Sequence, residues 1–256
     1  MLKKHKCATV VENSSIAMNI YSMVLSVGEG ELDYFRPGQF LHIKIPAGEL
    51  LLRRPISIND YDCAKNHIRI AYMVMGEGTK KLSAVRPGEE LDILFPLGNG
   101  YKLEDSHKKV LLIGGGIGIA PLLSVMTFYP DREYTALLGY RCKDLVYELE
   151  EFQQKAKKVL VTTDDGTFGQ KGFSTDLLEE QLMAEMPDVI LACGPHCFFA
   201  SLKKITSKYD VRTYASLEQH MGCGTGGCSV CVCKVAGENR RICMEGPVFD
   251  LAEVEV

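Results

Sequence analysis

Apolar positions in the first hundred residues fall in short runs, and turn-forming residues separate these runs. The runs predict strands at residues 8–11, 20–27, 40–45, 56–58, 68–73 and 91–95. Arg36-Pro37-Gly38-Gln39 and Arg86-Pro87-Gly88-Glu89 each precede a strand as a turn, because proline presets φ and glycine relaxes the backbone. Short strands in this rhythm predict an antiparallel β-barrel.

From Lys108 onward the pattern changes to strands that alternate with helices. Strands are predicted at residues 110–113, 133–138, 159–162 and 189–192, and helices at 121–128, 146–156, 174–183 and 197–207. This alternation predicts a parallel sheet with right-handed crossovers. Gly98-Asn99-Gly100 opens a polar linker between the two patterns, and a last strand at 211–216 leads into a cysteine-rich tail.

The two patterns and the tail predict an α+β multi-domain chain. It comprises a barrel at residues 1–100, an α/β parallel-sheet domain at 101–212 and a small module at 213–256. The length of 256 residues suits two domains with an appended module. Hydrophobic residues make up 46% and charged residues 24% of the chain, which is typical of globular proteins.

Charge and cysteine content narrow the class of partner. A net charge of −4 argues against a protein that neutralises nucleic-acid phosphates or anionic lipid. No run approaches the roughly 20 apolar residues that span a bilayer, and the basic start is not followed by an export signal. We therefore expect a cytoplasmic protein with no nucleic-acid or membrane partner. Ten cysteines in a reducing compartment favour metal binding over disulfides.

Five of the ten cysteines lie between residues 223 and 243. Cys223, Cys228 and Cys231 have C-x4-C-x2-C spacing, and Cys243 follows at a distance, which is the plant-type pattern for a [2Fe-2S] cluster. Glycines at 222, 224, 226 and 227 allow the loop to wrap closely around such a cluster. Zinc is the alternative, although its sites usually have two C-x2-C pairs. Cys233 is a further cysteine nearby, and we expect it to be a buried thiol outside the ligand set.

Arg54 begins a second candidate site, in the run Arg53-Arg54-Pro55-Ile56-Ser57. An arginine can clamp a pyrophosphate bidentately, and the serine on the same strand can reach the edge of a flavin ring. Gly76-Glu77-Gly78-Thr79 then precedes a predicted helix at residues 80–84, whose start suits a phosphate.

These two motifs resemble the FAD-binding barrel of the ferredoxin-NADP reductase superfamily. The resemblance implies that Arg54 binds the pyrophosphate and that the R-P-x-S strand lies along the isoalloxazine. It implies FAD contacts for Arg54, Pro55, Ile56, Ser57, Ala71, Tyr72, Met73, Gly78 and Thr79. The family often has tyrosine at the position of Ile56, so an aliphatic side chain would cover one flavin face here.

A glycine-rich turn follows the strand at 110–113 and leads into a helix that starts at Pro121. Strand, glycine turn and helix present backbone N–H groups to a dinucleotide pyrophosphate. The turn resembles the superfamily's G-x-G-I-x-P loop, and Cys193-Gly194-Pro195 resembles its C-G-P motif. The NAD residues so implied are Gly114, Gly116, Gly118, Pro121, Cys193 and Gly194. Arg141 and Lys143 leave NADP open as an alternative, although Asp144 offsets their charge.

Over its whole length the chain resembles the electron-transfer subunits of type B dihydroorotate dehydrogenases. The resemblance implies an FMN-containing catalytic partner, with two of each chain in a heterotetramer that serves pyrimidine biosynthesis. Electrons from dihydroorotate would pass through [2Fe-2S] and FAD to NAD+. No catalytic residue for the pyrimidine is assigned in this chain.

Two alternatives remain open at this point. The chain could be the flavin and iron–sulfur subunit of an NAD(P)H–ferredoxin or sulfide oxidoreductase, although those relatives often replace one cluster cysteine with aspartate. It could also be a non-catalytic adaptor with a zinc tail. Absorption bands of flavin and iron would separate the enzyme from the adaptor.

Overall fold

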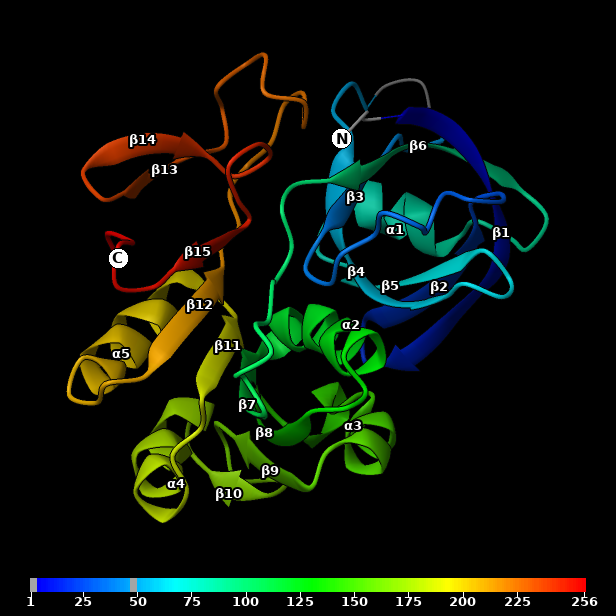
Figure 1. Cartoon of the computed structure of the whole chain (residues 1–256). Coiled ribbons are helices and arrows are strands. Elements are labelled where there is room, and N and C mark those ends of the chain that lie inside the picture. The colour runs from blue at the N-terminus through cyan, green and yellow to red at the C-terminus, as the bar shows by residue number, and fades with distance from the viewer. Residues whose placement is uncertain (1–3, 47–49) are drawn as a thin grey trace.

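The computed structural model describes residues 4–46 and 50–256 (Figure 1). Its first part is a closed barrel with strand order β1-β2-β5-β4-β3-β6, in which neighbouring strands are antiparallel. The strands are β1 (Lys4–Ala17), β2 (Ile20–Ser26), β3 (Phe40–Ile43), β4 (Arg54–Asp62), β5 (His67–Met73) and β6 (Glu90–Leu97). The predicted antiparallel barrel is therefore confirmed. Helix α1 (Glu77–Ser83) begins earlier than the predicted residue 80.

Strand β3 uses both of its faces. Leu41 and Ile43 belong to the core inside the barrel. Phe40 belongs instead to a cluster with residues of the tail, because successive side chains of a strand point to opposite faces. His42 shares the outer face with Phe40, so this strand presents an aromatic pair to the tail.

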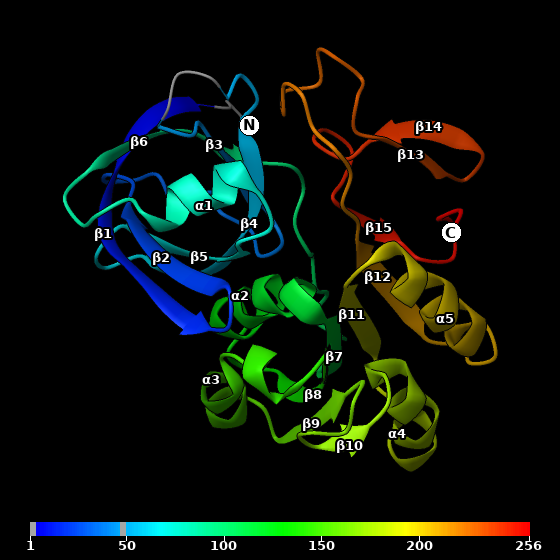
Figure 2. The same ribbon diagram turned by 180° about the vertical axis from the view of Figure 1, so that it is seen from behind.

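The second part is a sheet of seven strands in the order β10-β9-β8-β7-β11-β12-β15 (Figures 1 and 2). Its strands are parallel except the last, which runs antiparallel to its neighbour. The strands are β7 (Lys109–Gly115), β8 (Glu133–Tyr140), β9 (Lys158–Thr163), β10 (Gln170–Lys171), β11 (Val189–Cys193), β12 (Arg212–Ser216) and β15 (Val248–Asp250). The predicted parallel sheet is confirmed.

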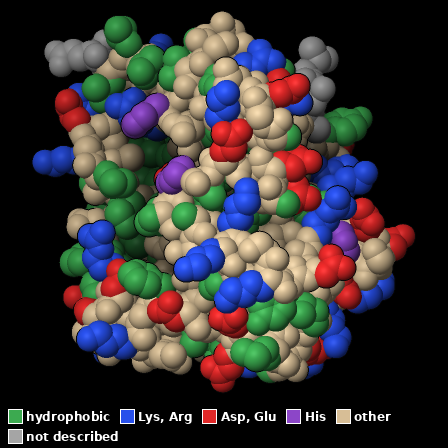
Figure 3. All heavy atoms as spheres, turned by 90° about the vertical axis from the view of Figure 1, so that its left-hand side faces the viewer, with side chains coloured by type: hydrophobic (Ala, Val, Ile, Leu, Met, Phe, Trp, Pro, Cys, Tyr) green, Lys and Arg blue, Asp and Glu red, His purple; other side chains and the backbone are tan. Residues whose placement is uncertain are grey.

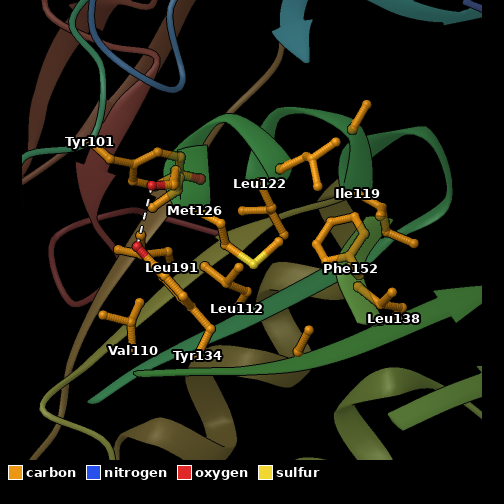
Figure 4. Packing of buried hydrophobic residues seen from close by; sticks show 14 of the residues in the cluster. Tyr101, Val110, Leu112, Ile119, Leu122, Met126, Tyr134, Leu138, Phe152 and Leu191 are labelled. Carbon is orange, nitrogen blue, oxygen red and sulfur yellow. Dashed lines mark hydrogen bonds between the residues drawn. The ribbon is translucent and has the colours of Figure 1, made fainter. Parts of the chain in front are cut away.

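Helices cover both faces of this sheet. They are α2 (Ala120–Phe128), α3 (Leu149–Lys155), α4 (Leu178–Ala184) and α5 (His196–Thr206). Val110 and Leu112 of β7 pack under α2, as Figure 4 shows, whereas Leu111 and Ile113 pack on the opposite side with α4 and α5. Burial on both faces explains the continuous apolar run in β7. No helix in the described part of the chain is long and apolar enough to cross a membrane.

The cysteine-rich tail is joined to the sheet rather than detached from it. The expected domain limit after residue 212 falls inside β12, and the tail contributes β15 to the sheet edge. Between them lies a hairpin of β13 (Val232–Val235) and β14 (Glu238–Arg241). The N–H of Asn99, in the linker, donates to the carbonyl of Gly246 at 2.6 Å. The tail is thus held by both the sheet and the linker.

Polar contacts join the barrel to the α/β domain. The amide of Asn59, on β4, donates to the carbonyl of Ala120 and to the carboxylate of Glu148, both at 2.9 Å. Arg69, on β5, forms two hydrogen bonds with Glu151 at 2.8 and 2.6 Å.

Glu148 has a left-handed φ of 55° directly before α3, and its side chain is only 4% exposed. Burial raises the pKa of Glu148 to about 7, and the charges of Glu151 and Asp60 act in the same direction, whereas Arg69 opposes them.

We predict that the folded state loses stability as pH rises, because the buried carboxyl of Glu148 must then ionise. The pKa of Glu148 is raised from 4.5 to about 7, so the stability that its neutral form supplies is complete below pH 4.5 and lost as pH rises through about 7. The loss in free energy of unfolding should amount to about 1–3 kcal/mol. Urea unfolding at several pH values should show a shallower pH slope for Glu148→Gln than for the natural chain. Glu150→Gln, at an exposed neighbour, is the control. An unchanged slope in Glu148→Gln would contradict the assignment.

Candidate functional site

The two parts of the expected flavin site meet in the structure. Arg54 begins β4, and Gly78 lies in α1. A Cβ atom built on Gly78 would lie 2.6 Å from Nε of Arg54, so the guanidinium rests directly on the backbone of the helix turn. Nη1 of Arg54 also donates to the carbonyl of Leu52 at 2.5 Å. A side chain at residue 78 would push the guanidinium away, which explains why glycine is needed there.

Thr79 stabilises this turn through its hydroxyl. Its Oγ1 accepts hydrogen bonds from the N–H groups of Met75 at 3.0 Å and Gly76 at 3.3 Å, and it donates to the carbonyl of Gly76 at 3.2 Å. The hydroxyl therefore fixes the loop in front of the helix. A direct contact between Thr79 and a phosphate stays a prediction.

Side chains on β5 divide between two environments. Ala71 and Met73 pack against the core of the α/β domain, so they face the boundary between the two domains. Tyr72 points the other way, into the barrel, where its hydroxyl donates to Asn13 at 2.9 Å and its ring stacks on Tyr21. Tyr72 would therefore contact the flavin through its backbone and not through its side chain.

The two motifs expected to bind NAD lie side by side. Gly114, at the end of β7, is paired with Cys193, at the end of β11. A Cβ atom on Gly118 would lie 2.7 Å from the carbonyl oxygen of Cys193 and 2.8 Å from Cα of Gly194. Only glycine fits at residue 118 because the two loops touch there. Gly116 has a φ of +57°, and Pro121 lies in the first turn of α2.

Cys193 carries an uncharged thiol at this sheet edge. Burial raises the pKa of Cys193 to about 12, and the nearby carboxylate of Glu218 raises it further, while a hydrogen bond with Ser216 opposes them. Burial also raises the pKa of Glu218. The sequence reasoning did not select Glu218 as a site residue. Its position could have indicated a role at the site. Glu218 lies two residues after β12, the last parallel strand, at the edge where ligands of such sheets bind.

Backbone N–H groups surround the first two cysteines of the loop. Sγ of Cys223 accepts hydrogen bonds from the N–H groups of Thr225 at 3.4 Å and Gly227 at 3.2 Å, and Sγ of Cys228 accepts one from the N–H of Cys223 at 3.3 Å. Burial by itself would raise the pKa of Cys223, but the hydrogen bonds from Thr225 and Cys228 lower it to about 6. Such a thiol is readily ionised, which is the form that binds metals.

The other two expected ligands are buried. Cys231 is 2% exposed and Cys243 is 1% exposed, and both pack in a cluster with Phe40, Leu97 and Ile242. The N–H of Ile242 donates to the carbonyl of Cys231 at 2.9 Å, which holds the two segments together. In residues 4–46 and 50–256, no three metal-ligating side chains are close enough to form a metal centre. Among these described residues the four thiols therefore form a pair in the loop and a buried pair, and the structure does not bring all four together. The chemistry of the donors, four thiols with N–H groups facing the sulfur atoms of Cys223 and Cys228, fits an iron–sulfur cluster.

Cys233 is partly buried and packs against the same cluster, but its thiol has a partner of its own. It lies on β13, and its thiol donates to the carbonyl of Arg240, on β14, at 3.6 Å. This bond engages the thiol within the hairpin. The exclusion of Cys233 from the ligand set stays a prediction that this geometry favours.

His42 is a second residue that the sequence reasoning missed. Its side chain is fully buried between the barrel and the cysteine loop, where a Cβ atom on Gly224 would lie 2.6 Å from its Nδ1. Burial lowers the pKa of His42 to about 4, and the nearby charge of Arg53 acts in the same direction. A histidine in an apolar strand gives no signal in a sequence.

Figure 3 shows the side of the molecule that carries the tail. This side is hollowed, and hydrophobic side chains lie inside the hollow.

The fold and these sites define a class of protein. The family model for the NAD-binding domain of oxidoreductases matches residues 112–204, and the model for the iron–sulfur cluster binding domain of dihydroorotate dehydrogenase B matches residues 218–255. The chain is thus an oxidoreductase that combines a nicotinamide domain with an iron–sulfur domain.

Relatives identify the family within that class. The dihydroorotate dehydrogenase B (NAD(+)) electron transfer subunit of Shouchella clausii is 41% identical over 99% of this chain and 99% of its own length. The subunit of the same name from Bacillus pumilus is 42% identical over 96% of each chain. The chain belongs to the family of dihydroorotate dehydrogenase B electron transfer subunits.

Solved structures agree with the fold. A chain of an NADH-dependent reduced ferredoxin-NADP oxidoreductase matches 97% of this chain and 89% of its own, at 30% identity and a TM-score of 0.87. Phthalate dioxygenase reductase matches 85% of this chain and 70% of its own, at 20% identity and a TM-score of 0.68. The second likeness shows the shared fold alone.

We predict that Cys243→Ser abolishes or destabilises the cluster and that Cys233→Ser leaves it in place. Only Cys243 completes the ligand spacing, and the thiol of Cys233 is engaged with Arg240. Iron and acid-labile sulfide per chain, together with the visible absorption spectrum, measure the outcome. Equal loss of iron from both variants would show that the ligand assignment is wrong.

We predict that Arg54→Ala weakens FAD retention at least tenfold, a change of about 1.4 kcal/mol, because a charge-assisted clamp on the pyrophosphate is lost. Flavin content after gel filtration and the FAD dissociation constant measure it. Arg53→Ala is the matched control, because Arg53 pairs with Asp92 of β6 at 2.8 Å. That variant should lose thermal stability and retain its flavin affinity. Equal flavin affinity in Arg54→Ala and the natural chain would refute the clamp.

Proposed function

We propose that this chain carries electrons from a catalytic subunit to NAD+, through a [2Fe-2S] cluster and FAD. The electrons come from the oxidation of dihydroorotate at the FMN of the partner, as a step in pyrimidine biosynthesis. The observation that carries the proposal is the packing of the cysteine segment on β3, the strand that pairs with β4. This packing supports the proposal because Cys231 and Cys243 lie against β3, and the neighbouring strand β4 holds Arg54 and Ser57.

Each group of residues has one task in this proposal. FAD, when bound, converts between hydride chemistry and the transfer of single electrons. Arg54 holds its pyrophosphate, and the strand from Pro55 to Ser57 orients its ring. The glycine loop at residues 114–118 binds NAD through backbone N–H groups.

Two buried ionisable side chains lie at the sheet edge where the nicotinamide is expected. Cys193 and Glu218 lie beside each other there, and both are held towards their neutral forms by burial. A neutral thiol neither attacks the nicotinamide ring nor repels its phosphates. Burial therefore keeps the Cys193 thiol uncharged and shifts Glu218 towards its neutral form.

The family implies a catalytic dihydroorotate dehydrogenase B subunit as partner. We propose that this partner contains FMN, that two copies of each chain assemble, and that the complex works in the cytoplasm. The pyrimidine binds to the partner, which agrees with the lack of an assigned base for dihydroorotate in this chain.

A ferredoxin- or sulfide-linked reductase subunit is the second candidate. The structural likeness to the NADH-dependent reduced ferredoxin-NADP oxidoreductase favours it. Four cysteines in the cluster pattern and about 40% identity to dihydroorotate dehydrogenase B subunits over the full chain favour the first candidate.

Co-purification and anaerobic turnover test the proposal. The chain is expressed with its neighbouring catalytic subunit, and the complex should contain FAD, FMN and iron and reduce NAD+ when dihydroorotate is added. The catalytic subunit without this chain should oxidise dihydroorotate with an artificial acceptor and leave NAD+ unreduced. A complex that reduces NAD+ only with ferredoxin or sulfide as the electron source would favour the second candidate. A chain that purifies with neither flavin nor iron would overturn both.

A further inference from the structure

His42 is a fully buried histidine whose two ring nitrogens are both unpartnered in the described part of the chain. A neutral imidazole has one N–H donor and one acceptor nitrogen. Buried polar groups are nearly always hydrogen-bonded, because desolvation without a partner is costly. A leucine or phenylalanine would fill the same space without this cost, so the ring has a use beyond packing.

The ring lies between the flavin strand and the cysteine loop. On one side, His42 is paired with Pro55 in the register of β3 and β4, and Arg53 approaches the carbonyl oxygen of His42 at 3.5 Å. On the other side, Gly224 approaches so closely that a Cβ atom there would lie 2.6 Å from Nδ1 and 2.9 Å from Cε1. Phe40 packs edge-on against the ring, with centroids 6.2 Å apart at 74°.

Gly224 is the residue that directly follows Cys223, the first expected ligand of the cluster. It has a φ of +67°, which turns the loop over the imidazole. Nδ1 of the ring therefore faces the loop that would hold sulfur atoms. Cluster sulfides and cysteine thiolates accept hydrogen bonds, and such bonds are one of the means by which a protein sets the potential of a cluster.

We propose that His42 donates its ring N–H to a sulfur atom of the cluster held by the loop at residues 223–228, and that this bond raises the reduction potential of the cluster. The inference rests on the proposed function, because it needs the cluster to be bound. A donor stabilises the reduced cluster, which carries more negative charge, more than the oxidised one. His42 is thus a positioning residue that makes the cluster a better electron acceptor at the boundary with the flavin barrel.

Redox titration of the cluster-loaded full chain tests this inference, with the reduced cluster followed by electron paramagnetic resonance. His42→Leu should lower the equilibrium constant for reducing the cluster about three- to tenfold, and a tenfold change corresponds to about 59 mV for one electron. The g-values of the reduced cluster should shift as well. His42→Gln keeps an N–H donor and should restore most of the potential. His67→Leu removes a histidine from β5, outside the cluster that Phe40 forms with the tail, and it should leave the potential near that of the natural chain.

Iron content gives a second measurement where a variant takes up the cluster poorly. Loss of iron in His42→Leu with retention in His42→Gln supports the donor role. Full iron with unchanged potential and g-values in His42→Leu overturns this inference alone, and so does equal loss of iron from His42→Leu and His42→Gln. A natural chain that takes up no iron overturns the proposed function together with the inference.

Discussion

The outer face of β3 is the contact on which the arrangement of the sites depends. Side chains of a strand alternate between faces, so a single short strand closes the barrel with Leu41 and Ile43 and receives the tail with Phe40 and His42. The tail brings its own apolar surface to this face, including Ile242 and the two buried cysteines. The cysteine segment is therefore fixed relative to the flavin strand by buried apolar packing.

Two further connections keep the tail in this position. The strand β15 adds to the sheet beside β12, and the linker residue Asn99 bonds to the tail through both its backbone and its side chain. The barrel and the α/β domain are joined separately, through Asn59 and Arg69. Electron transfer requires fixed separations between carriers, and this network helps to hold the three parts of the chain in place.

The architecture could be predicted from the sequence because it depends on local patterns. Short apolar runs separated by turns with proline and glycine predicted the barrel. Apolar runs that alternate with helical segments predicted the parallel sheet. The strands β10, β14 and β15 were not predicted, since each is short and is formed by pairing with a distant or polar partner. The start of α1 was placed too late because Thr79, which was taken to precede the helix, lies inside it.

The residues of the candidate site also fall into a group that the sequence predicts and a group that it does not. Motifs that are continuous in the chain, such as the glycine loop and the cysteine spacing, were found from their residues alone. Glu148, Glu218 and His42 were not, because their properties come from burial by segments far away in the sequence. The sequence also did not show where the side chain of Tyr72 points. The alternation along a strand shows that its two faces differ, but it does not show which face meets the second domain.

The place of β15 in the sheet has a consequence for the solubility of the chain. A parallel sheet that ended at β12 would expose a row of unpaired backbone groups, which other chains can pair with during folding or at high concentration. The sheet ends instead at β10, of 2 residues, and at β15, of 3 residues. Edges this short offer little for intermolecular pairing, so the strand that anchors the tail also protects the sheet against aggregation.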